Sequence, residues 1–263
     1  MPTIQKQFDL TGRAALITGG TGWLGTAFSE AMAESGASVV VGSRDLERAQ
    51  AAAEKLPKLG GAVHHGVRLD QMEPEPLNQG FNDAVAAAGK IDILVNNGLE
   101  ACPNDWTDAT FEQFARHQVN NAGYFVLARL LRNHAVERKA PASIVMLGSM
   151  YGVVASYPDA YEGVSVASPV AYHALKGGTI HMTRHLAAYW AKDNVRVNCI
   201  SPGPFPIDND IPPEMERRLC AKNPMKRMGR PHELKGVLIL LVSDAGSYIA
   251  GQNILVDGGW TAW

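Results

Sequence analysis

The sequence has few cysteines and no long apolar segment. Three cysteines, scattered and odd in number, argue against a disulfide framework and a zinc site, so we interpret Cys102, Cys199 and Cys220 as buried thiols. No stretch reaches the roughly eighteen uninterrupted apolar residues that a membrane helix needs, and residues 1–10 lack the apolar core of a secretory signal. We therefore expect a cytoplasmic protein outside the membrane.

The sequence also lacks an excess of charge. It has 24 Lys and Arg against 26 Asp and Glu, a formal net charge of −2, and no basic run. This pattern indicates neither nucleic acid nor an anionic membrane as a partner and leaves a small-molecule substrate. A chain of 263 residues with 46% apolar content suits one domain with a sizeable core.

Short apolar runs alternate with helical patterns along the whole chain, without a composition break or an internal repeat. This alternation predicts a single α/β domain with a doubly wound, Rossmann-type, mainly parallel sheet and helices on both faces. The predicted helices span residues 111–131, 170–190 and 231–242, and the predicted strands span 14–18, 38–43, 62–69, 91–95, 143–147, 195–200 and 253–256.

A glycine-rich turn separates the first predicted strand from a helical pattern. Gly20, Gly22 and Gly25 match G-x-G-x-x-G, which places a pyrophosphate on backbone N–H groups at a helix N-terminus. A turn without a ligand is the alternative, and the flanking strand and helix favour a dinucleotide. Further polar or glycine-containing segments follow strand ends, where ligands bind in such sheets: Ser43–Arg44, 96–98, Ser149 and Pro202–Gly203.

The end of the second strand predicts which dinucleotide binds. An NAD site offers a carboxylate there, to the ribose 2′-hydroxyl. This chain has Ser43 and Arg44, a hydroxyl and a guanidinium that suit a 2′-phosphate. We therefore expect NADP, with NAD as the alternative if Arg44 is only a solvated side chain on a first helical turn.

Tyr172 and Lys176 lie four residues apart in a predicted helix, so both side chains point from one face. A phenol has a pKa of about 10, and lowering that pKa to about 7 takes about 4 kcal/mol. An ammonium about 4 Å away, at an effective dielectric of about 20, supplies about 4 kcal/mol. The pair therefore predicts a proton-transferring phenol without a metal.

His181 and His185 are also four apart in this helix and could suggest a metal site. No carboxylate or thiol has a matching spacing, so we predict no metal. His117 carries no functional signal in the sequence.

Taken together, these residues resemble the short-chain dehydrogenase/reductase family from about Leu10 to Gly259. The resemblance rests on Thr18-Gly19…Gly25, Asn96-Asn97-Gly98, Asn120 with Gly123, Ser149, Tyr172 with Lys176, Pro202-Gly203 and residues 251–259.

The resemblance implies a catalytic tetrad. Tyr172 donates or accepts the proton, and Lys176 lowers its pKa and holds the nicotinamide ribose. Ser149 binds the substrate oxygen, and Asn120 holds a water in a proton relay. Asp70 contacts the adenine and Asn96 lies along the cofactor. The full predicted cofactor-binding set is Gly19, Gly20, Gly22, Leu24, Gly25, Ser43, Arg44, Asp70, Asn96, Tyr172, Lys176, Pro202 and Gly203.

Three positions depart from the family pattern. Trp23 stands where the family has glycine, which predicts a changed path of the phosphate loop. Gly98 replaces an alanine, and Ile207 replaces a threonine expected near the carboxamide.

An insertion is predicted between Ser149 and Tyr172, because the family has a shorter segment there. We expect this segment, residues 152–169, to form a polar wall of the substrate pocket that suits a hydroxylated substrate; packing on a neighbouring subunit is the alternative. Its candidate side chains are Tyr157, Asp159, Tyr161 and Glu162. Residues 203–224 are also expected to border the pocket, with Asp208 and Asp210 in a proline-stiffened loop or an irregular crossing.

The sequence thus predicts an NAD(P)-dependent oxidoreductase that interconverts a secondary alcohol and a ketone, with a polyol or sugar-derived substrate. The alternatives are a non-catalytic dinucleotide-binding regulator on the same fold, and a sugar epimerase or dehydratase. Trp260 and Trp263 end the chain, and a tail with two indoles indicates burial in a homo-oligomer, a tetramer by resemblance.

Overall fold

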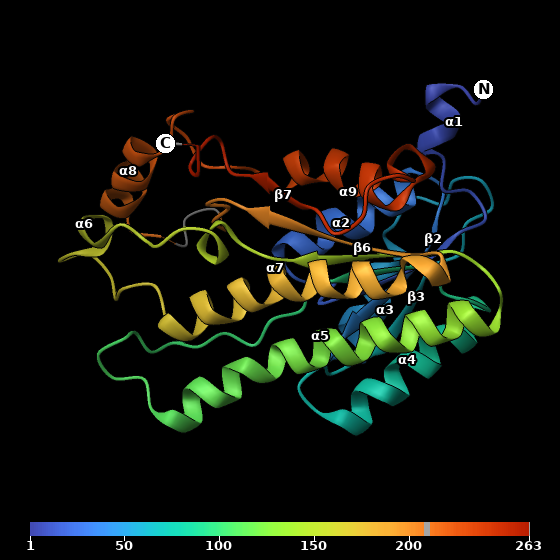
Figure 1. Cartoon of the computed structure of the whole chain (residues 1–263), viewed down its shortest axis with the longest axis horizontal. Coiled ribbons are helices and arrows are strands. Elements are labelled where there is room, and N and C mark those ends of the chain that lie inside the picture. The colour runs from blue at the N-terminus through green and yellow to red at the C-terminus, as the bar shows by residue number, and fades with distance from the viewer. Residues whose placement is uncertain (208–210, 263) are drawn as a thin grey trace.

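The computed structural model describes residues 1–207 and 211–262. In these residues seven parallel strands form one sheet in the order β3-β2-β1-β4-β5-β6-β7, with helices on both faces (Figure 1). The doubly wound, single-domain α/β fold predicted from the alternation of patterns is confirmed. The order reverses between β1 and β4, and such a reversal opens a crevice at the carboxyl ends of the strands.

The strands are β1 (Ala14–Thr18), β2 (Ser38–Ser43), β3 (His65–Arg68), β4 (Ile93–Asn96), β5 (Ala142–Leu147), β6 (Val195–Pro202) and β7 (Asn253–Val256). The α-helices are α1 (Ile4–Phe8), α2 (Trp23–Glu34), α3 (Leu46–Glu54), α4 (Pro74–Ala88), α5 (Phe111–Glu137), α6 (Pro158–Tyr161), α7 (Val170–Trp190), α8 (Pro213–Lys222) and α9 (Lys235–Val242).

β3 is shorter than predicted. Residues 62–64 were expected in the strand but lie outside it, because side chains take over the hydrogen bonds there. The N–H of Val39 donates to Nδ1 of His64 (3.1 Å), and the N–H of Val63 donates to Oγ of Ser38 (3.1 Å). Other predicted ends also differ: β4 begins two residues later, β5 begins one residue earlier and β6 continues to Pro202. Among the helices, α5 continues to Glu137, and residues 231–234 are a 3₁₀ helix before α9.

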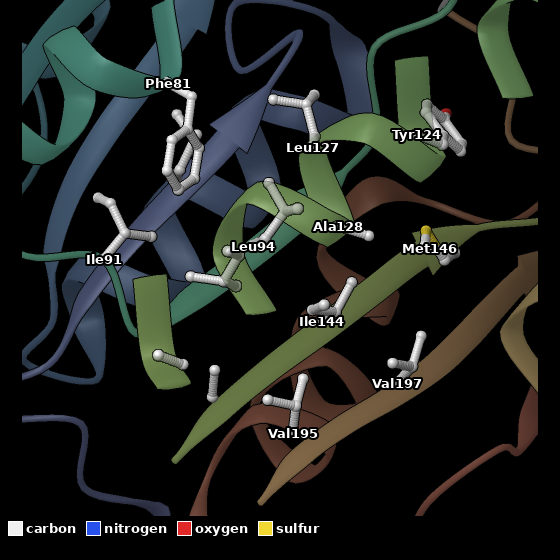
Figure 2. Close-up of a cluster of buried hydrophobic side chains, with 14 of the residues drawn as sticks. Phe81, Ile91, Leu94, Tyr124, Leu127, Ala128, Ile144, Met146, Val195 and Val197 are labelled. Carbon is white, nitrogen blue, oxygen red and sulfur yellow. The ribbon is translucent and has the colours of Figure 1, made fainter. Parts of the chain in front are cut away.

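Two apolar cores sandwich the sheet. One lies between the sheet and α4, α5 and α7, where Phe81, Leu127 and Ile144 pack together (Figure 2). The other lies under α2, α3 and α9 and contains Phe28 and Leu238. Burial on both faces explains why the strands read as unbroken apolar runs in the sequence.

Two short helices extend the fold beyond the carboxyl ends of β6 and β7. In Figure 1, α6 and α8 lie together at one end of the molecule with the C-terminus, whereas α1 and the N-terminus lie at the other. Of the helices in the described residues, none combines the length and apolar content needed to cross a membrane.

Candidate active site

The glycine turn after β1 leaves the N-terminus of α2 open to a ligand. Gly19 has a left-handed φ of +59°, and a Cβ there would lie 2.8 Å from Cα of Gly98. Gly22 caps α2 without a side-chain hydrogen bond in the described residues, so the N–H groups of the first turn remain for an anion. The turn therefore fits the phosphates of a dinucleotide.

The other glycines of the fingerprint are needed for packing. A Cβ on Gly25 would lie 2.1 Å from the carbonyl oxygen of Gly19, and one on Gly20 would lie 2.9 Å from Cγ1 of Val41. Trp23 is the first residue of α2, and its side chain lines the groove beside the turn. Because the helix starts after Gly22, the turn closes without glycine at position 23, with the N–H of Gly22 donating to the oxygen of Gly19.

This groove, the glycine-loop groove, has a volume of about 640 Å³ and runs across the strand ends. Ser43 and Arg44 lie in it, and the Arg44 side chain is 69% exposed, with Nη1 3.9 Å from Oε2 of Glu100. Glu100 itself is held by Arg116, whose Nε and Nη2 donate to its two carboxylate oxygens at 2.7 and 3.0 Å. Predicted residues that line the groove are Gly19, Gly22, Leu24, Ser43, Arg44 and Asp70. Arg48 and Glu100, which no motif marked, line it too, as does Asn97, which belongs to the Asn96-Asn97-Gly98 motif but was not in the predicted cofactor set.

Asn97, rather than the predicted Asn96, faces the groove. Asn96 is fully buried, and its Nδ2 donates to the carbonyl of Tyr124 at 2.9 Å, so its side chain does not line the groove. Nδ2 of Asn97 donates to the carbonyl oxygens of Thr18 and Gly19, at 3.0 and 3.1 Å, and so ties β4 to the glycine turn. The alternation of side chains along an extended chain turns one of two adjacent asparagines inward.

Gly98 contacts Gln71, a residue that no motif marked. Nε2 of Gln71 donates to the carbonyl of Gly98 at 2.5 Å and to Oδ1 of Asn120 at 3.0 Å. A Cβ on Gly98 would lie 2.4 Å from Oε1 of Gln71. An alanine at position 98 would therefore displace the amide of Gln71 and disturb its hydrogen bond to Asn120, so the two residues depend on each other.

A second cavity, the Tyr172 cavity, has a volume of about 510 Å³ and contains three of the four predicted catalytic residues. Ser149 follows β5, and Tyr172 and Lys176 come from α7. Pro202 and Gly203, predicted as cofactor residues, also line it. The cavity and the glycine-loop groove share Leu24, Asn97 and Leu99, so the two spaces adjoin.

Burial controls the ionisation of both members of the Tyr172–Lys176 pair. It raises the pKa of the Tyr172 phenol, which the Ser149 hydroxyl partly offsets. It lowers the pKa of Lys176 to about 8, and the ammonium donates to the carbonyl of Leu147 at 2.6 Å. Nζ of Lys176 lies 5.6 Å from the centre of the Tyr172 ring. The pKa of Tyr172 thus lies above its ordinary value in this structure, opposite to the expected direction, because desolvation of the phenolate dominates.

All hydrogen-bonding groups of the Asn120 side chain have partners within the protein. Its two N–H groups donate to the carbonyls of Glu100 (3.0 Å) and His117 (2.9 Å), and its oxygen accepts from the N–H of Glu100 and from Gln71. An amide nitrogen has two donors, so none remains for the expected relay water. The side chain instead fastens the segment after β4 to α5.

His117 lies beside the catalytic phenol, which its sequence context did not indicate. The ring is 3% exposed, and its centre lies 6.3 Å from that of Tyr172. Neither ring nitrogen has a hydrogen-bond partner among the described residues. Burial lowers the pKa of His117, and Glu100 offsets this only in part, while the nearby Lys176 lowers the pKa further. The ring therefore favours its neutral form.

The candidate wall residues at 152–169 divide into two groups. Tyr161 lines the Tyr172 cavity, and its hydroxyl is 2.7 Å from that of Tyr151. Asp159 instead pairs with Lys222 at 2.6 Å, and Glu162 is exposed. Tyr157 packs against Trp260 with ring centres 5.4 Å apart. Of the four candidate side chains, Tyr161 therefore lines the cavity, whereas the carboxylates of Asp159 and Glu162 do not.

Trp260 is buried within its own chain. It is 1% exposed in a cluster with Met150, Ala160, Tyr161 and Leu219. Its burial therefore needs no neighbouring subunit, and the expectation that it packs in an oligomer interface is wrong. Trp263, like Asp208 and Asp210, lies outside the described residues.

Comparison with known proteins identifies the family of this chain. A family model described as enoyl-(acyl carrier protein) reductase matches residues 22–261. D-arabinitol 2-dehydrogenase (ribulose-forming) of Scheffersomyces stipitis is 33% identical, covering 99% of this chain and 98% of that protein. Galactitol 2-dehydrogenase of Rhizobium johnstonii is 34% identical, covering 98% and 99%. The crystal structure of a short-chain type dehydrogenase/reductase from Mycobacterium marinum is 30% identical, with a TM-score of 0.88 over 100% of both chains.

A dinucleotide groove that adjoins a cavity with serine, tyrosine and lysine defines a nicotinamide-dependent oxidoreductase. The chain belongs to the short-chain dehydrogenase/reductase family. It is an NAD(P)-dependent enzyme that interconverts a secondary alcohol and a ketone.

Proposed function

We propose that the protein is a polyol 2-dehydrogenase, which interconverts a secondary hydroxyl of a small sugar alcohol and the corresponding ketone with NADP. The observation that carries this proposal is the Tyr172 cavity, where Ser149, Tyr172 and Lys176 adjoin the glycine-loop groove. The two relatives named above, a D-arabinitol and a galactitol 2-dehydrogenase, support the substrate class.

Bound nicotinamide supplies the hydride transfer. The Ser149 hydroxyl holds the substrate oxygen, and Tyr172 takes the hydroxyl proton in oxidation or returns it in reduction. Lys176 would hold the ribose of a bound nicotinamide cofactor, and it would place a positive charge near the phenolate of Tyr172 as it forms. The fixed positions of these groups, on the end of β5 and on α7, orient the substrate for transfer.

Absorbance of the reduced nicotinamide tests the function directly. Purified protein is assayed with C5 and C6 alditols, simple secondary alcohols and the corresponding ketones, with NAD and with NADP. We expect oxidation of at least one alditol with a kcat/KM above that for the simple alcohols. Turnover of simple alcohols alone would contradict the polyol proposal.

Two guanidinium groups in the glycine-loop groove, Arg44 and Arg48, support NADP as the cofactor. Glu100 in the same groove is held by two hydrogen bonds from Arg116, so its weaker contact with Arg44, at 3.9 Å, leaves Arg44 available to a phosphate. The Ser43 hydroxyl, 3.5 Å from that of Thr21, is a further donor beside it.

Arg44→Ala is expected to weaken NADP binding about 10- to 150-fold, because a charge-assisted hydrogen bond contributes about 1.5–3 kcal/mol. NAD binding should change little, and Arg48→Ala measures whether the second guanidinium shares the phosphate. Fluorescence titration with both cofactors gives the dissociation constants. Arg129→Ala, an exposed arginine on α5 outside both cavities, is the control. Equal losses for NAD and NADP would reject the assignment of Arg44.

The substrate wall that we propose comes from residues 152–169, the predicted insertion, and from residues 203–224. Tyr161, Ser168 and Pro169 of the first segment line the Tyr172 cavity. From the second, Phe205 and Leu219 line it. The two segments are joined where Arg218 donates to the carbonyl of Glu162 at 2.7 Å, so they form one continuous wall.

A homotetramer in the cytoplasm remains our proposal for the assembly and its location. Large apolar side chains exposed on the described surface, among them Trp106, Phe111 and Tyr189, support association. Light scattering at micromolar concentration should give four times the 28.3 kDa chain mass. A monomeric mass would contradict this proposal.

A further inference from the structure

Two phenols form a polar pair in the lining of the Tyr172 cavity. The hydroxyls of Tyr151 and Tyr161 lie 2.7 Å apart, and both side chains line the cavity together with Ser149 and Tyr172. Tyr151 belongs to the 3₁₀ helix that follows Ser149, and Tyr161 ends α6. The pair therefore combines one residue beside the catalytic serine with one from the substrate wall.

The surrounding structure holds both rings in place. The Tyr151 ring stacks on that of His173, with centres 4.8 Å apart and planes at 20°, and a nitrogen of His173 lies 3.2 Å from Oγ of Ser168. Tyr161 is 8% exposed and packs in the cluster around Trp260. Side chains fixed before binding lose little conformational entropy when a ligand binds.

The hydrogen-bonding capacity of the pair fits an uncharged oxygen. One hydroxyl donates to the other, so one O–H donor and several lone pairs remain for a ligand. Burial raises the pKa of both phenols, so both remain neutral. A ligand hydroxyl, which both donates and accepts, matches this set.

The rest of the cavity does not suit an anion. Among the described residues that line it, Lys176 carries the only charge, and its ammonium donates to the carbonyl of Leu147. Much of the remaining lining is apolar, including Leu99, Phe205, Leu219 and Met228. A carboxylate placed at the phenol pair would lose its hydration without gaining a cationic partner, which is costly.

We propose that the Tyr151–Tyr161 pair binds a second, uncharged hydroxyl of the substrate and thereby selects neutral polyols over sugar acids. This inference rests on the proposed dehydrogenase function and adds the residues and the charge class that determine its specificity. One hydroxyl of the polyol reacts between Ser149 and Tyr172, and another binds at the phenol pair.

The test is Tyr161→Phe, which keeps the ring and its packing and removes the hydroxyl. Loss of a buried hydrogen bond costs about 1–3 kcal/mol, so kcat/KM for a neutral alditol should fall about 5- to 150-fold. For a simple monohydroxy secondary alcohol, kcat/KM should fall much less. Tyr151→Phe should give the same split, and a thermal melt verifies that each variant is folded.

Glu162→Gln is the matched control, since Glu162 is adjacent to Tyr161 but exposed and outside the cavity. The native enzyme is also assayed with an alditol and the aldonate of the same chain length, and we expect kcat/KM to favour the alditol by at least about tenfold. Equal loss for polyol and simple alcohol in both tyrosine variants, or a preference for the aldonate, would overturn the role of the pair while leaving the dehydrogenase intact. Absence of any polyol turnover by the native enzyme would overturn both proposals.

Discussion

Tyr172→Phe is expected to lower kcat by at least about 100-fold and to leave cofactor binding in place. General acid–base catalysis contributes about 10²- to 10⁴-fold, and phenylalanine keeps the ring but has no proton to transfer. Tyr172 lines the cavity together with Ser149, and the buried ammonium of Lys176 lies 5.6 Å from the centre of its ring. Steady-state kinetics with an alditol and a separate cofactor titration measure the two effects.

Tyr124→Phe is the matched control for this prediction. Its buried phenol lies near the same ammonium, with Nζ of Lys176 5.8 Å from the ring centre, but its hydroxyl donates to the carbonyl of Gly98 and does not line the cavity. We expect this variant to keep most of its turnover. If Tyr172→Phe retains more than about a tenth of native kcat, the loss is less than about tenfold and therefore smaller than the smallest expected loss of about 100-fold. Tyr172 is then not the acid–base residue.

Lys176→Met is expected to reduce both turnover and cofactor affinity, a combination that distinguishes it from Tyr172→Phe. Methionine keeps most of the apolar stem and removes the charge near the phenol and the donor proposed for the ribose. It also leaves the carbonyl of Leu147 without its hydrogen bond, which costs about 1–3 kcal/mol of stability. A melting curve therefore accompanies the kinetics and the cofactor titration.

The pH dependence of Lys176→Met has a defined sign. Burial already raises the pKa of Tyr172, and a nearby cation favours the phenolate. Without that cation the pKa of Tyr172 should rise further. The rate of alcohol oxidation, which increases with pH as Tyr172 ionises, should therefore reach its maximum at a higher pH. Lys90→Met, at the opposite end of β4 beside Asp92, is the control. An unchanged pH profile together with native cofactor affinity would rule out both proposed roles of Lys176.

The tertiary structure also revises how the Tyr172–Lys176 pair is understood. Spacing along a helix placed the two groups on one face, and Coulomb's law then predicted a lowered phenol pKa. The same helix face is buried, and burial acts against both charged forms, raising the pKa of Tyr172 and lowering that of Lys176 to about 8. The spacing of residues along a helix cannot predict this desolvation, because desolvation depends on which other elements pack over the helix.

Local patterns determined the fold and the strand-end position of the site. A strand buried on both faces must be apolar, and a turn that approaches a phosphate needs glycine, so residues 14–25 specify a strand, a turn and a helix by themselves. The same holds for the end of β5 with Ser149 and for α7 with Tyr172. The carboxyl ends of parallel strands then meet at one edge of the sheet, which brings these residues together.

Contacts between distant segments were decided only by the tertiary structure. Gln71 packs against Gly98, Trp260 is buried by its own chain, and the hydroxyl of Tyr161 contacts that of Tyr151 while the neighbouring Glu162 faces solvent. No sequence periodicity or motif predicts these contacts. A side chain's local sequence sets its backbone conformation, whereas its partner and its burial depend on which other elements pack against it.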